Sequence, residues 1–164
     1  MTTLDPNSVP VYQKGLTWED QPAGFAFRTA ARTMTESDLT SFVNLCGLNE
    51  PLFLDARNAA EGGYTGRLIP GSLTFCFAEG LVFQSTAIHG TGMAFLHMDL
   101  DIKKPVYVGD TIEVVVEVTE SRGSSRGGTG IVTAKNTVFN QKGEVVMEYM
   151  PVRMIRGRDF VAQG

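Results

Sequence analysis

The stretch SLTFCFAEGLVF, residues 72–83, decides the fold of this 164-residue chain. Apolar side chains would occupy nearly every side of a helix drawn over it, and Glu79 is its one charged residue. A helix without a broad polar face has to be covered on most of its sides. The spacing predicts a helix from about Ser72 to Ala87 that is covered by the rest of the chain. Because an unpaired buried charge is costly, Glu79 is expected to be paired or to face a partner subunit.

The residues that follow this helix are predicted to form its cover. They contain three long strand patterns, at residues 93–106, 111–121 and 130–156. The third pattern is two strands joined at NQKG, a hairpin turn. A shorter strand is predicted over residues 25–33, where Phe25 and Phe27 alternate onto one face. This order of elements predicts an α+β fold, with an antiparallel sheet curled around a central apolar helix.

Two capped helices are predicted between the first strand and the apolar helix. Thr35 followed by Asp38 is typical of a capping box, and apolar residues recur at helical spacing over residues 36–46. Asp55 is expected to cap a short helix over residues 56–61. Each helix is followed by glycine, which commonly ends helices.

Composition and charge indicate how many domains the chain has and which classes of partner it lacks. With 43% hydrophobic residues, residues 25–164 are expected to form a single domain, preceded by an irregular, proline-containing segment over residues 1–24. The net charge is −4 and basic residues are spread along the chain, which argues against a nucleic-acid partner. The N-terminus does not resemble a secretory signal. No apolar stretch reaches the roughly 20 residues that cross a bilayer, so we expect a cytoplasmic protein without a membrane partner.

The two cysteines, Cys46 and Cys76, both fall within apolar helical patterns. Neither has the paired spacing of a metal site. They are expected to be buried, reduced thiols, and the sequence predicts no metal.

Four segments, in this order, resemble the MaoC-like hydratases and dehydratases of the hotdog superfamily. They are RTMTESDLTSFVNLCG, NEPLFLDARNAA, GRLIPGSL and KKPVYVGDTIEV. The resemblance covers roughly residues 30–156. It implies a hotdog fold, an acyl-CoA substrate or ligand, no cofactor other than the coenzyme A of that substrate, and a homodimer or higher homo-oligomer with a thioester tunnel between subunits.

The loop CGLNEPLFLD, residues 46–55, departs from the family pattern. The family's loop usually reads G-D-x-N-P-x-H, where the Asp and His act on water and on the carbon next to the thioester carbonyl. When the two are aligned on Gly47 and Pro51, the Asp position holds Leu48, the Asn position holds Glu50 and the His position holds Phe53. Neither Leu nor Phe can transfer a proton, so the usual acid and base are absent.

Two polar residues of this loop are candidates for catalysis. Glu50 would act as a base if its side chain faced an apolar cavity, because burial raises the pKa of a carboxyl group. Asn49 would orient water. The alternative interpretations are a surface carboxylate and a turn residue.

The start of the apolar helix keeps the other half of the family's site. The resemblance places the oxyanion donor at the backbone N–H of Gly71, where a helix N-terminus favours developing negative charge. Pro70 stands where many relatives have His. Ser72 has no adjacent base in the sequence and is interpreted as a capping residue. Leu48 and Phe53 would close this site with apolar bulk.

These residues leave three functions open. The first is a hydratase or dehydratase with an altered site, in which Glu50 is the acid–base group. The second is a non-catalytic acyl-CoA-binding or partner subunit. The third is an acyl-CoA thioesterase, which would also use Glu50. His97 is expected on a solvated strand face, and Arg153, Arg156 and Arg158 either meet coenzyme A phosphates or are solvated.

Overall fold

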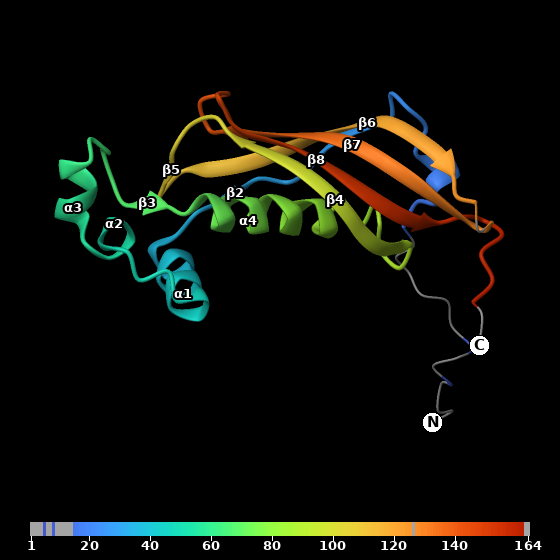
Figure 1. The fold of residues 1–164 in the computed structure, drawn as a ribbon, viewed down its shortest axis with the longest axis horizontal. Coiled ribbons are helices and arrows are strands. Elements are labelled where there is room, and N and C mark those ends of the chain that lie inside the picture. Colours follow the sequence, from blue (N-terminus) through green and yellow to red (C-terminus); the bar gives the residue numbers. More distant parts are fainter. Residues whose placement is uncertain (1–4, 6–7, 9–14, 126, 163–164) are drawn as a thin grey trace.

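The structure, a computed structural model, describes residues 5, 8, 15–125 and 127–162. Its central element is α4 (Gly71–Gln84), and a curved antiparallel sheet arches over this helix (Figure 1). The predicted α+β fold, with a sheet wrapped around an apolar helix, is confirmed. None of the helices in the described residues is long and apolar enough to cross a membrane.

The sheet has the strand order β1-β6-β7-β8-β4, and β2 pairs with β6 beside β1. Its strands are β1 (Ala26–Arg28), β2 (Arg32–Thr33), β4 (Gly92–Ile102), β6 (Thr111–Gly123), β7 (Thr129–Asn140) and β8 (Val145–Arg156). The predicted strand over residues 25–33 is therefore two short strands. It is interrupted because the Val114 N–H donates to the side-chain Oγ1 of Thr29, at 3.0 Å, instead of to a backbone carbonyl.

Three short helices lie at the end of the molecule where α4 begins (Figure 1). The first, α1 (Glu36–Cys46), has the predicted capping box: the Asp38 N–H donates to Thr35 Oγ1 at 3.2 Å, and the Thr35 N–H donates to Asp38 Oδ2 at 3.0 Å. The predicted helix α3 (Ala56–Glu61) is also present, capped by Asp55. Between them lies α2 (Pro51–Leu54), a single turn in the loop that the sequence analysis left without a helix.

A second, two-stranded sheet holds the start of α4 in place. It pairs β3 (Leu68–Ile69), which leads into α4, with β5 (Val106–Tyr107), which follows β4. The main core lies between α4 and the inner face of the large sheet. Its fully buried side chains include Leu73, Ala78, Ile112, Val114, Val138, Met147 and Tyr149.

One side of α4 is open in the single chain, which corrects the prediction that the chain covers this helix on most sides. Phe83 is 56% exposed on α4, and Phe95 and Ile102 are exposed on β4. The two cysteines are also exposed and free, although burial was predicted for both. The reason is that Cys76 lies on the less covered side of α4 and Cys46 is the last residue of α1. Partial burial, together with Cys46 and Glu79, nevertheless raises the pKa of Cys76.

The described part of the N-terminal segment is tied to the sheet. The N–H of Gly15 donates to the carbonyl of His89 at 2.8 Å, and a 3₁₀ turn covers Trp18–Asp20. Trp18 packs so closely on Gly130 of β7 that a Cβ at that glycine would collide with the indole ring. Residues 15–24 are therefore part of the packed domain. Of residues 1–14, all but 5 and 8 lie outside the described residues.

Candidate functional site

A pocket of about 300 Å³ opens at the N-terminus of α4. Its walls come from α2, β3, the first turn of α4, the end of β4 with the loop after it, and the start of β8. Most of the lining is apolar. The polar side chains among the lining residues are those of Tyr64, Thr74, Lys103 and Lys104.

The first turn of α4 presents free backbone donors to this pocket. Pro70 is the N-cap residue, has no N–H of its own, and leaves the helix without a side-chain cap. The first backbone N–H with a hydrogen-bond acceptor inside the helix is that of Thr74, which donates to the Pro70 carbonyl at 3.0 Å. The N–H of Gly71, which lines the pocket, lies among the unpaired donors of the helix terminus. Such a terminus stabilises negative charge on an oxygen placed next to it.

Three of the predicted site residues come together in this pocket: Phe53, Pro70 and Gly71. Phe53 comes from α2 and also packs against the main core. An aromatic ring and a proline therefore line the pocket together with the residue that begins the helix. The wall beside Gly71 is apolar.

The other four predicted residues do not line the pocket. Asn49 and Glu50 are exposed, while Leu48 is half-buried and packs against the core. Glu50 is the N-cap residue of α2, but its side chain caps nothing, and among the described residues that side chain has no hydrogen bond or ion pair. Ser72 is exposed and is not the capping residue, because the helix begins one residue earlier than predicted.

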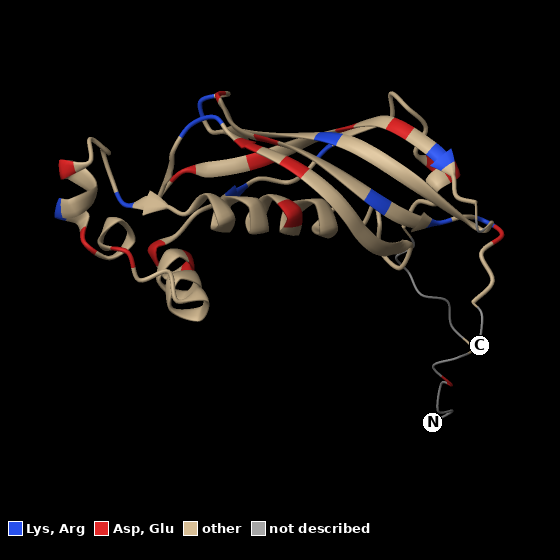
Figure 2. Cartoon of the chain, in the orientation of Figure 1, with Lys and Arg blue, Asp and Glu red and all other residues tan. Residues whose placement is uncertain are grey.

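Lys103 and Lys104 line the pocket from the loop that follows β4, and both side chains are partly exposed at its mouth. Figure 2 shows basic residues in that loop. Lys104 Nζ lies 2.7 Å from Glu144 Oε1. Lys103 Nζ lies 3.1 Å from Asp101 Oδ2, and this hydrogen bond raises the pKa of Lys103. The sequence analysis missed both lysines as site residues. The sequence did offer a signal for them, because the pair of lysines in KKP stands at the end of a predicted strand. Only the structure shows that this strand end lies beside the segment GRLIPG.

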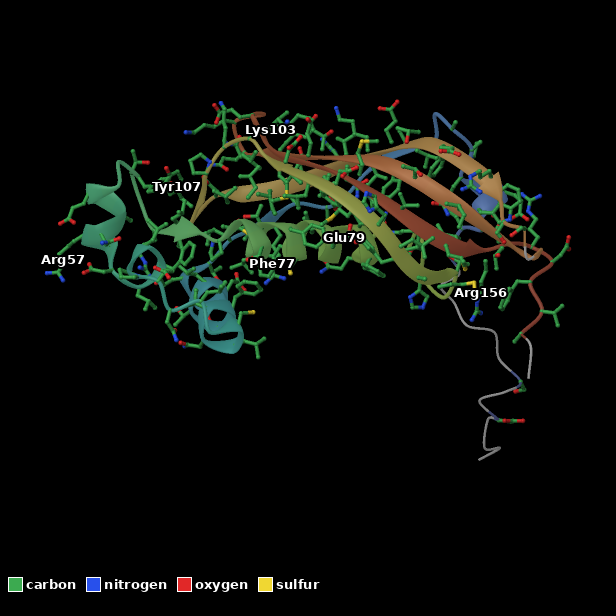
Figure 3. All side chains as sticks on the ribbon, in the orientation of Figure 1. Arg57, Phe77, Glu79, Lys103, Tyr107 and Arg156 are labelled. Carbon is green, nitrogen blue, oxygen red and sulfur yellow. The ribbon has the colours of Figure 1, made fainter. Side chains whose placement is uncertain are left out.

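A buried polar cluster lies between α4 and β8, behind the pocket. Glu79 points from α4 toward the sheet (Figure 3), and its Oε1 accepts a hydrogen bond from the Tyr149 hydroxyl at 2.8 Å. Arg153 Nη2 donates to both Glu79 oxygens, at 2.6 and 2.8 Å. The prediction of a paired Glu79 is confirmed. Burial, and then the charge of Glu79, raises the pKa of Tyr149, so this hydroxyl stays a donor.

The arginines near the C-terminus lie away from the pocket. Arg153 is buried with Glu79, so it does not reach coenzyme A phosphates at the surface. Arg158 pairs with Asp20, and the guanidinium of Arg156 lies 4.8 Å from the ring of Phe160. His97 is exposed next to Asp99, as predicted. In the described part of the chain, no group of three or more His, Cys, Asp or Glu residues is placed to hold a metal ion.

Comparisons with known proteins match this architecture. A family model described as "FAS1-like, dehydratase domain region" matches residues 21–149. The chain is 30% identical to the (R)-specific enoyl-CoA hydratase of Aeromonas caviae over 111 residues, which are 68% of this chain and 78% of that protein. It is 33% identical to a mitochondrial 3-hydroxyacyl-acyl-carrier-protein dehydratase of Solanum lycopersicum over 88 residues, 54% of this chain but only 50% of that protein.

A solved structure of a putative MaoC domain protein dehydratase from Chloroflexus aurantiacus superposes with a TM-score of 0.85 at 29% identity. The superposition covers 94% of this chain and 44% of that one. The match therefore extends over nearly the whole of the present fold.

Proposed function

Because the chain belongs to the MaoC-like dehydratase family of the hotdog superfamily, we propose that it binds an acyl-CoA thioester in the pocket at the start of α4. The thioester carbonyl oxygen would accept a hydrogen bond from the N–H of Gly71. The observation that carries this proposal is the uncapped N-terminus of α4, which opens into an apolar pocket. Coenzyme A enters as part of the ligand, and no separate cofactor is needed for binding.

The two lysines at the pocket mouth support this orientation of the ligand. With the acyl group inside, the coenzyme A portion leaves the pocket past Lys103 and Lys104. Both lysine side chains are partly exposed, at 40% and 50%, and their ammonium groups already lie close to carboxylates. Phosphate groups of coenzyme A would exchange with those carboxylates as partners of the lysines.

The lining of the pocket favours binding over hydration. Adding water to an enoyl thioester needs a base for the water and an acid for the developing enolate. Phe53 and Pro70, next to the proposed carbonyl site, supply neither. Hydration is the second candidate, and one observation favours it: the unpaired carboxylate of Glu50 lies three residues before Phe53 at the start of α2.

Binding and turnover of butanoyl-CoA and crotonyl-CoA by purified protein test the proposal. Calorimetry is expected to show binding of both compounds, and the absorbance of the enoyl thioester is expected to stay constant. Glu50→Gln is expected to leave the affinity unchanged within about twofold, because Glu50 does not line the pocket.

The opposite results identify the alternatives. Hydration that disappears in Glu50→Gln would establish the hydratase candidate, and release of free coenzyme A would establish the thioesterase. Glu61→Gln is the matched control, because it makes the same change in an exposed carboxylate of α3. Failure of both compounds to bind would refute the proposal.

Gly71→Ala is expected to weaken acyl-CoA binding by about tenfold, the effect of overpacking a close contact. A Cβ at this position would collide with Cδ1 of Ile102 across the pocket. Ile102 is exposed and its side chain can move, so the fold is expected to persist. Calorimetry measures the loss. The double variant Gly71→Ala/Ile102→Ala, which removes the collision, is expected to recover most of the affinity, and an equal loss in both variants would contradict this explanation.

We further propose that two copies pair through β4. This strand lies at the edge of the sheet and, in the described structure, hydrogen-bonds to β8 on one side alone. An unpaired edge strand is a template for another strand. Exposed apolar residues of β4, together with one on α4, form the candidate interface. We call this set the β4 face: Met93, Phe95, Leu96, Ile102 and Phe83.

A further inference from the structure

We propose that the pocket at the start of α4 takes short acyl chains, of about four carbons, and that Met147 sets this limit. The inference rests on the proposed binding of acyl-CoA with its carbonyl at Gly71. Two observations support it: the lining of the pocket ends at Thr74 and Met147, and Tyr149, two residues after Met147 on β8, does not line it.

On the helix side, the pocket is one turn deep. Gly71 and Thr74 line it, and no residue of α4 beyond Thr74 does so. Thr74 is about 4.5 Å further along the helix axis than Gly71. A carbon–carbon bond is about 1.5 Å long, so a chain that starts at Gly71 reaches this depth within about four carbons.

On the sheet side, the lining of the pocket ends at Met147. Val146 and Met147 of β8 line it, whereas Tyr149, two residues further along on the same face, does not. Met147 is 1% exposed and Thr74 is 2% exposed, and we infer that these two buried side chains form the floor of the pocket. The volume of about 300 Å³ is at the lower end of the range for ligand sites.

Tyr149 stands behind this floor and is held on two sides. Its hydroxyl donates to Glu79, which Arg153 holds in turn, and its ring meets the ring of Phe75 edge-on at 5.3 Å. The ring therefore cannot swing away to admit a longer chain. Shortening Met147 is expected to deepen the pocket by roughly the three atoms beyond its Cβ, and Tyr149 is expected to stop the chain there.

Calorimetric binding of butanoyl-, hexanoyl-, octanoyl- and dodecanoyl-CoA tests the inference. The wild-type protein is expected to bind octanoyl-CoA at least about tenfold more weakly than butanoyl-CoA, because each methylene that does not fit is costly. In Met147→Ala, hexanoyl-CoA is expected to bind as tightly as butanoyl-CoA, and the deficit of octanoyl-CoA is expected to become smaller. Dodecanoyl-CoA is expected to remain weak, because Tyr149 is still in place.

Met150→Ala is the matched control. It makes the same change on the same strand, but Met150 is 39% exposed and does not line the pocket. Removing most of a buried Met side chain also destabilises a core. Met147→Val, a smaller deletion, therefore provides a second test and is expected to gain affinity for hexanoyl-CoA alone.

Each contrary result has a distinct meaning. Equal binding of octanoyl- and butanoyl-CoA by the wild-type protein would overturn the length limit while supporting the proposed function. Binding of no acyl-CoA would overturn both. An unchanged chain-length profile in folded Met147→Ala and Met147→Val, or the same shift in Met150→Ala, would overturn the role of Met147.

Discussion

Replacing Arg153 with methionine is expected to lower the free energy of unfolding by about 3–5 kcal/mol. Arg153 and Glu79 are both more than nine-tenths buried, and the guanidinium donates to both carboxylate oxygens. Without it, Glu79 keeps the Tyr149 hydroxyl as its single side-chain donor. The large loss thus comes from a buried carboxylate left without its counter-charge, and denaturant unfolding measures it.

Two controls separate this cause from a general loss of packing. The double variant Glu79→Gln/Arg153→Met carries no buried charge and is expected to be more stable than Arg153→Met. Lys104→Met breaks an ion pair with Glu144 that is largely exposed, and it is expected to cost much less. A deficit of the same size in the double variant would contradict the explanation.

Phe83→Glu is expected to convert the proposed homodimer into a monomer, weakening self-association by about 100-fold or more. Phe83 is 56% exposed on α4 and belongs to the β4 face. In a dimer formed through this face, a glutamate at position 83 would be buried in an apolar contact without a partner. Sedimentation equilibrium of the wild-type and variant proteins measures the change.

Val161→Glu is the control for this experiment. It introduces the same charge at an exposed apolar residue, 81% accessible, that lies after the last strand and outside the β4 face. It is expected to leave the dimer intact. A wild-type protein that sediments as a monomer, or a dimer that survives Phe83→Glu, would contradict pairing through the β4 face.

The sequence was a reliable guide wherever the determinants of structure are local. The capping box at Thr35 and Asp38, the Asp55 cap and the hairpin at residues 140–143 all form as predicted. Each depends on side chains and backbone groups within four residues of one another. The apolar pattern over residues 72–83 likewise determined that a central helix would lie against a sheet.

The sequence misplaced features that depend on how distant elements meet. It predicted buried cysteines, but the sheet covers one side of α4 and leaves Cys76 exposed. It expected Arg153 either to meet coenzyme A phosphates or to be solvated, although β8 brings this residue against α4 to Glu79, 74 positions earlier in the chain. An apolar pattern gives the period of a helix, but it does not say which side a neighbouring element will cover.

The same distinction between local and long-range determinants applies to the residues of the site. The sequence alone placed the start of an apolar helix to within one residue of Gly71. The resemblance to the family led us to expect Leu48, Glu50 and Phe53 in place of the usual polar loop residues. Both expectations follow from order along the chain. Only the tertiary structure decided that Phe53 lines the pocket while Glu50 stays outside it, and that Lys103 and Met147 also line it. These residues come from α2, the end of β4 and the start of β8, which meet because the sheet curls around α4.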